Sequence, residues 1–96
     1  MRHDKIRAKG LEVLMKDALL NSIEHALAGE WDAAHNIVQQ WEGNGTAAWI
    51  HAVLHKIEGD PANSRYWYRR AGKMEHLAED PRTELEQIKK ELANHA

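Results

Sequence analysis

Residues 29–41 read GEWDAAHNIVQQW and residues 59–71 read GDPANSRYWYRRA, and the likeness between these two segments decides the fold class. Each segment opens with a glycine followed by an acidic residue. Each then repeats apolar or small side chains at spacings of three and four, which is the pattern of one helix face. A shift of thirty residues superimposes the turns and the faces, so that Ile37 coincides with Trp67. The sequence therefore predicts two copies of one helical hairpin.

Helical periodicity continues outside these segments, and no run of residues alternates as a strand does. The predicted fold is all-α, with two stacked antiparallel hairpins and a C-terminal capping helix in one domain of residues 1–96. We expect hairpin 1 over about residues 11–42, hairpin 2 over about 46–72 and the capping helix over about 81–94. Repeated hairpins cannot bury their apolar faces alone, so the two copies should stack.

The repeated hairpin resembles the tetratricopeptide class, and YWYRRA at residues 66–71 resembles the second helix of its Sel1-like branch. The unit is shorter than the usual roughly thirty-four residues and lacks the W-x2-L-G-x2-Y signature. The resemblance therefore implies the stacked architecture and no binding residues. Residues 49–72 also resemble small uncharacterised bacterial proteins that share an HxxxH, Gly-Asp and Tyr-Trp-Tyr pattern, which implies no known activity.

Composition narrows the function classes. The chain has no cysteine, which excludes a disulfide framework, a thiolate metal site and a cysteine nucleophile. Thirteen Lys and Arg against fifteen Asp and Glu argue against a surface built globally for nucleic acid or an anionic membrane. Residues 1–17 lack the apolar run of a signal peptide, and no later run has membrane-spanning length. We expect a cytoplasmic protein without a membrane partner.

The sequence contains no recognisable catalytic motif. Its serines and threonines lie in helix or helix-start positions, without the strained turn of a nucleophile elbow. The GNG at residues 43–45 lacks the strand, helix and lysine of a phosphate-binding loop. We therefore expect no enzymatic activity and no cofactor, apart from a divalent metal in one alternative.

That alternative depends on His51 and His55. Four residues apart, they share one helix face, so both imidazoles can approach a single zinc or similar ion. Two ligands do not close a site, and a third would have to come from His25, His35 or a carboxylate. The sequence favours histidines that only pack and bond a carbonyl or carboxylate, and it leaves open a metal site or a pH-sensitive contact.

A second candidate surface is the basic face of the helix expected over residues 61–72. Its members are Arg65, Tyr66, Arg69, Arg70 and Lys73. Positive charge beside an aromatic ring suits an acidic protein or peptide, a phosphate or, less favoured, RNA. The acidic residues of segment 75–86 could instead fold back and neutralise this face.

The four tryptophans divide into two groups. Trp41, Trp49 and Trp67 lie on apolar stripes and are expected in the core. Trp31 follows the Gly-Glu turn, where it either staples the turn or stands exposed, and an exposed indole there would favour a dimer contact.

The leading hypothesis for function is a small helical-repeat interaction module. Such a module binds a protein or peptide partner or forms a homodimer, because a short stack leaves repeat faces uncovered at its ends. The first alternative is a metal-binding or metal-dependent protein that uses His51 and His55. The second alternative is phosphate or RNA binding through the basic face of helix 61–72.

Overall fold

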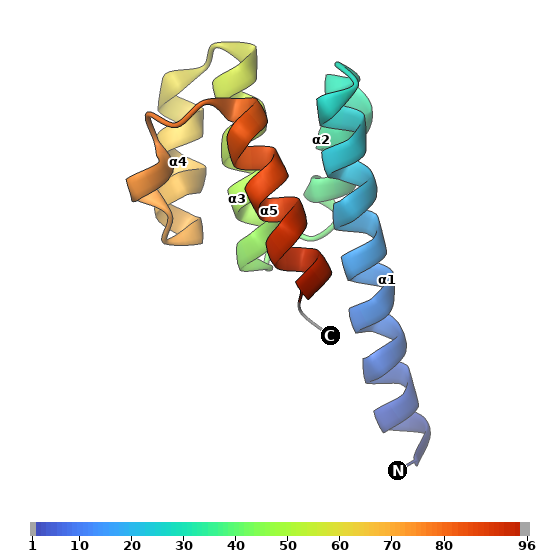
Figure 1. Ribbon diagram of the computed structural model, residues 1–96. Helices are drawn as coiled ribbons and strands as arrows, with labels where there is room; N and C mark the ends of the chain where they lie inside the picture. The colour runs from blue at the N-terminus through green and yellow to red at the C-terminus, as the bar shows by residue number, and fades with distance from the viewer. Residues whose placement is uncertain (1, 95–96) are drawn as a thin grey trace.

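The computed structural model describes the backbone of residues 2–94 and the side chains of residues 10–94, and this part of the chain is all-α as predicted. Its elements are α1 (Arg2–Leu27), α2 (Trp31–Gln39), α3 (Gly45–Glu58), α4 (Pro61–Ala71), the 3-10 turn η1 (Met74–His76) and α5 (Pro81–Asn94). Figure 1 shows α1 to α4 running alternately up and down, with α5 antiparallel to α3. No helix of the described chain is both long enough and apolar enough to cross a membrane.

Two turns of the same construction join α1 to α2 and α3 to α4. Gly29 and Gly59 have φ angles of 80° and 87°, in the region where a side chain is strained. After each glycine, the next N–H donates to the carbonyl four residues before that glycine, over 2.8 Å in the first turn and 2.9 Å in the second. This pair of features ends a helix in the left-handed conformation. The two turns are therefore equivalent and lie thirty residues apart, as predicted.

A buried serine joins the two helices of each pair. Ser22 Oγ donates to the carbonyl of Ala34 over 2.9 Å, and Ser64 Oγ donates to the carbonyl of Ala52 over 2.8 Å. A shift of thirty residues places Ser22 on Ala52 and Ala34 on Ser64. The same two positions are thus bonded in both pairs, with donor and acceptor exchanged.

Helix α3 is the centre of the molecule. Residues 47–55 are all buried, because α1, α2, α4 and α5 each pack against this helix. Trp49 and Trp67 are buried as expected, with 2% and 7% of their surface exposed. The neighbouring helices cover both the apolar side of α3 and the side that carries its histidines. His51 and His55 are therefore interior residues.

Trp41 is less buried than predicted, and two aliphatic residues of α1 and α3 are exposed. Leu11 is 53% exposed, because α1 begins at Arg2 and its first part extends beyond the other helices (Figure 1). Ile57, in the last turn of α3, is 45% exposed. Trp41 packs against the core with part of its surface, and its buried Nε1 has no hydrogen-bond partner within the described chain.

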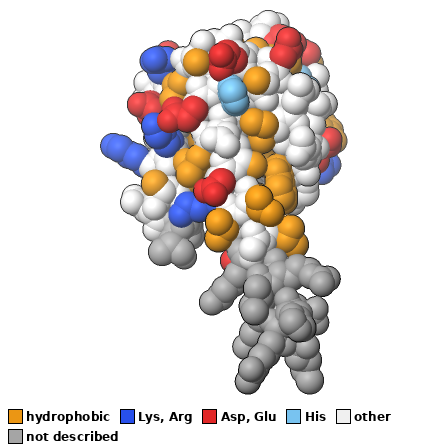
Figure 2. Space-filling view, turned by 90° about the vertical axis from the view of Figure 1, so that its right-hand side faces the viewer, with side chains coloured by type: hydrophobic (Ala, Val, Ile, Leu, Met, Phe, Trp, Pro, Cys, Tyr) orange, Lys and Arg blue, Asp and Glu red, His pale blue; other side chains and the backbone are white. Residues whose placement is uncertain are grey.

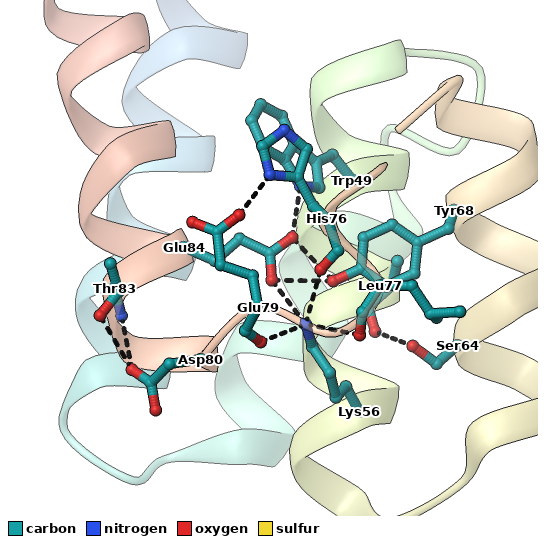
Figure 3. A network of polar contacts seen from close by, with 11 residues as sticks. Trp49, Lys56, Ser64, Tyr68, His76, Leu77, Glu79, Asp80, Thr83 and Glu84 are labelled. Atoms are coloured by element: carbon teal, nitrogen blue, oxygen red, sulfur yellow. Dashed lines mark hydrogen bonds and ion pairs between the residues drawn. The ribbon is translucent and has the colours of Figure 1, made fainter. Parts of the chain in front are cut away.

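An ionic network that the sequence did not predict fixes α5 against α3 and α4 (Figure 3). Glu84 is fully buried, and its carboxylate accepts hydrogen bonds from Trp49 Nε1 (2.7 Å), Lys56 Nζ (2.7 Å) and the Tyr68 hydroxyl (2.7 and 2.8 Å). Lys56 Nζ also donates to the carbonyls of His76 (3.1 Å), Leu77 (3.3 Å) and Glu79 (2.7 Å). A buried charge is tolerated only when it is paired and hydrogen-bonded. The network meets that condition, and burial together with Glu84 raises the pKa of Tyr68.

Candidate metal centre

Helices α2 and α3 bring His35, His51 and His55 together. One ligand nitrogen from each ring lies within 4.8 Å of the other two, and the Nε2 atoms of His35 and His51 are 3.1 Å apart. His51 and His55 share a face of α3 as predicted, and α2 supplies the third ring. His25 does not join them, because its Nδ1 atom lies 2.7 Å from Glu30 Oε1 at the end of α1.

Two indole rings pack on the histidine rings. Trp31 stacks on His35 with ring centroids 4.5 Å apart and an angle of 17° between the planes. Trp67 stacks on His51 at 3.8 Å and 13°. The indole N–H of Trp31 donates to the carbonyl of Leu54 over 2.6 Å, which fixes that ring against α3. Trp31 is therefore half-buried with an internal contact, and packing limits the rotation of the histidines.

Burial favours the neutral forms of His35 and His51. His51 and His55 are 3% and 7% exposed, whereas His35 is partly exposed. Burial first, and then the charges of His35 and His55, lower the pKa of His51 to about 3. Burial and His55 also lower the pKa of His35. The neutral imidazole is the form whose lone pair binds a metal ion, and the lowered pKa values of His35 and His51 favour that form in these two rings.

Glu58 provides the contact that orients a metal-binding histidine. Its Oε1 atom lies 2.8 Å from Nδ1 of His55. In this arrangement Nδ1–H donates to the carboxylate, and the lone pair of Nε2 is left for a metal ion. Carboxylates bonded in this way fix the tautomer and the ring position of metal ligands. The sequence analysis did not single out Glu58, although its spacing of three from His55 on one helix would have identified it.

His51 retains an unsatisfied nitrogen. Its Nδ1 atom is buried and has no hydrogen-bond partner within the described chain. Its Nε2 atom bonds only to His35, so one nitrogen of His51 stays unsatisfied whichever of the two rings donates the proton. Such a buried group costs about 1–3 kcal/mol. This cost is unusual for a histidine whose only role is packing, because packed histidines normally bond a carbonyl or a carboxylate.

The nitrogen positions suit a tetrahedral ion. Zinc binds imidazole at about 2.0–2.1 Å, which places two ligand nitrogens about 3.3 Å apart in a tetrahedral site. The 3.1 Å between His35 and His51 is close to that separation. His55 completes the group within the wider limit of 4.8 Å, so its ring would move slightly inward on binding. The three residues present therefore fit a divalent transition metal.

A second group with metal-ligand spacing shares His55. Ligand atoms of His55, Glu58 and Asp60 also lie within 4.8 Å of one another. Asp60, however, is the N-cap of α4, where its side chain accepts the N–H of Asn63 over 3.2 Å. Glu58 is bonded to His55. Both carboxylates thus have structural roles already, and the three-histidine group is the stronger candidate.

The basic face of α4 is exposed. Arg65 and Arg69 make no hydrogen bond or ion pair with the described residues, and both are exposed. Arg70 lies over Tyr66, with its guanidinium carbon 5.7 Å from the ring centroid and NH1 3.3 Å from the hydroxyl. That contact occupies the Tyr66 hydroxyl and one side of its ring. Lys73 Nζ lies 4.6 Å from the centroid of the Trp49 ring, away from the two free arginines.

The acidic segment does not neutralise this face, and that alternative was wrong. Glu84 pairs with Lys56, and Glu79 lies 2.5 Å from Nδ1 of His76. Asp80 accepts hydrogen bonds from the N–H and the hydroxyl of Thr83, which lower the pKa of its carboxyl. These carboxylates bond to Lys56 of α3 and to groups at the start of α5 and in the turn before it, and not to the arginines of α4.

No protein-family model, curated protein or solved structure matches the chain. The tetratricopeptide resemblance stays a prediction, and the proposed function is based on the geometry of the site.

Proposed function

We propose that this protein binds one divalent transition-metal ion, such as zinc, through His35, His51 and His55. The observation that carries the proposal is the convergence of three imidazole nitrogens within 4.8 Å, two of them on nearly buried rings. Imidazole suits zinc, copper, nickel and iron, whereas magnesium and calcium prefer oxygen ligands. The proposal thus reverses the order of the hypotheses drawn from the sequence.

Packing alone is the competing explanation for the three rings. It accounts for the stacked tryptophans, but not for the bond that His51 makes. A packed histidine is expected to bond a carbonyl or carboxylate, and His51 bonds only to His35. A metal ion would explain why these two Nε2 atoms face each other, because it would replace the proton between them and bind both lone pairs.

Metal analysis of the purified protein tests the proposal. We expect one zinc ion per chain after zinc loading and desalting, and strong loss of zinc in the His35→Ala variant. His25→Ala is the matched control, since His25 is a partly exposed histidine outside the group. An absence of stoichiometric zinc in the wild-type protein, or equal zinc retention by the His35→Ala and His25→Ala proteins, would refute the proposed function.

We also infer that the two hairpins form a short tetratricopeptide-like stack. The inference is supported by the two equivalent glycine turns and by the exchanged serine bonds at equivalent positions. In this arrangement the metal group lies where α2 of the first hairpin packs against α3 of the second. A bound ion would then link the two repeats.

A second candidate function, binding of an acidic protein or peptide, is supported by the unpaired arginines of α4. Because Arg70 occupies Tyr66, the face has charge without a free stacking ring, which favours a carboxylate partner over RNA. We expect a polyglutamate peptide to bind more weakly as salt rises, and binding to be lost in Arg65→Ala/Arg69→Ala. Lys90→Ala on α5 is the control. Binding that survives the double substitution would exclude this face.

Self-association is the other form of the interaction hypothesis. Leu11, Val13 and Leu14 are 53%, 60% and 62% exposed on α1. Figure 2, which views the molecule from the side of α1, shows apolar side chains gathered above the atoms drawn in grey. Exposed apolar patches of this kind favour contact with another molecule. Sedimentation at several protein concentrations, with Leu14→Lys as the variant, distinguishes a homodimer from a monomer.

A further inference from the structure

The three-histidine group offers a metal ion fewer ligands than a structural site does. Structural zinc is held by four protein ligands, whereas catalytic zinc has three and keeps one position for water or substrate. Within the described chain, no fourth histidine or carboxylate belongs to the group of His35, His51 and His55. The chain has no cysteine. The described residues therefore leave one tetrahedral position without a protein ligand.

The nearest carboxylate is not available for that position. Glu58 lies 2.8 Å from Nδ1 of His55, so Nε2 is the nitrogen of that ring that is left for the ion. Direct binding of Glu58 to the same ion would break this bond and release the His55 ring from its orientation. The carboxylate thus supports a ligand and does not replace one.

His35 is the most exposed of the three histidines. His51 and His55 are nearly buried, and Trp67 covers one face of the His51 ring. His35 is partly exposed, although Trp31 stacks on it. Among the three ligands, only His35 thus has more than a small exposed fraction. A fourth ligand from solution would enter beside this ring.

Charge favours an anion or hydroxide at this position. Three neutral imidazoles leave the charge of a divalent ion uncompensated, in a site of low dielectric constant. Glu58 acts through His55, and the carboxylates of Asp32 and Glu42 influence His35 only from a distance. A small anion bound directly to the ion would lower the electrostatic cost of burying it.

We propose that the bound metal ion keeps an exchangeable fourth ligand, water or hydroxide, which small inorganic anions can replace beside His35. This inference rests on the proposed metal-binding function. It assigns the centre to the open class of metal sites, in which the ion can activate water, and not to the closed structural class. The sequence-based expectation of no enzymatic activity can then be tested with substrates that a metal-bound hydroxide attacks.

Cobalt(II) is the probe for this inference, because its visible absorption bands report the number and type of its ligands. The full-length protein is loaded with cobalt, and sodium azide is then titrated into the sample at constant ionic strength. We expect protein-dependent cobalt bands that change with azide and reach saturation. Free cobalt with azide in the same buffer serves as the reference, and the His25→Ala protein should behave as wild type.

Two results would overturn the inference, and they differ in what they imply for the function. Cobalt bands that are lost in His35→Ala but do not respond to azide would mean a closed site, so that metal binding stands and the open position does not exist. An absence of protein-dependent cobalt bands in the wild-type protein would overturn both proposals. A wild-type spectrum that changes with azide and saturates supports the open position.

Discussion

Replacement of Glu84 by glutamine should destabilise the protein more than any exposed charge change. The side chain of Glu84 is fully buried and accepts hydrogen bonds from three groups, one of which is the Lys56 ammonium. Glutamine keeps the shape, but it removes the negative charge and one acceptor oxygen. Lys56, whose side chain is 18% exposed, then keeps a mostly buried charge without its partner.

The expected loss can be estimated from measured buried pairs. Removal of one partner of a buried ion pair costs about 3–5 kcal/mol. We expect about 3 kcal/mol here, because the remaining amide oxygen still accepts a hydrogen bond, out of a total stability of roughly 5–15 kcal/mol for a domain. At about 4–8 °C per kcal/mol for a chain of this size, the midpoint of thermal unfolding should fall by about 12–24 °C.

Urea unfolding followed by far-ultraviolet circular dichroism measures this loss. The matched control is Lys89→Ala, which removes the exposed pair between Lys89 and Glu24 with side chains 43% and 56% exposed. An exposed pair contributes only about 0–1 kcal/mol. If Glu84→Gln loses no more stability than Lys89→Ala, the buried network does not hold α5 in place, and our account of the fold is wrong.

The remaining predictions concern the metal centre and the repeated turn. The lowered pKa of His51 means that the unfolded chain binds a proton between about pH 6.5 and about 3 while the folded chain does not, so metal-free protein should lose stability as the pH falls through this window. Urea unfolding at pH 7 and pH 5 in a chelator should show a smaller loss for His51→Gln, and equal losses would contradict the assignment. Zinc at one hundred times its dissociation constant should raise the unfolding free energy by about 2.7 kcal/mol in wild type, and a thermal midpoint that does not depend on zinc would count against binding. Gly59→Ala should cost about 1–2 kcal/mol in urea unfolding, because its φ is 87° and no neighbouring atom obstructs a Cβ, so that only the backbone is strained. Gly10→Ala, inside α1, should instead be neutral or stabilising by up to about 1 kcal/mol, and equal effects at the two glycines would be inconsistent with the turn geometry.

Local features of the fold were predictable from the sequence. The all-α class followed from helical periodicity, and the positions of the two turns followed from Gly29 and Gly59. Both depend on residues that are close together in the chain. The placement of His51 and His55 on one face was predictable for the same reason, since it needs only the geometry of one helix.

Features that depend on how the helices pack were not predictable. The choice of His35 over His25 as the third histidine depends on the packing of α2 against α3, and the sequence left both histidines open. Glu84 and Lys56 are 28 residues apart, and no spacing rule links them. A glutamate in the first turn of an amphipathic helix normally faces water. Glu84 is buried only because α3 and α4 pack around the start of α5.

X-ray absorption at the zinc edge of zinc-loaded, desalted protein tests the central claim most directly. Our account predicts a first shell of three imidazole nitrogens at about 2.0–2.1 Å and one exchangeable oxygen ligand, with the imidazole signal reduced in His35→Ala and unchanged in His25→Ala. A first shell made of carboxylate and water oxygens, or protein that retains no zinc after desalting, would contradict it.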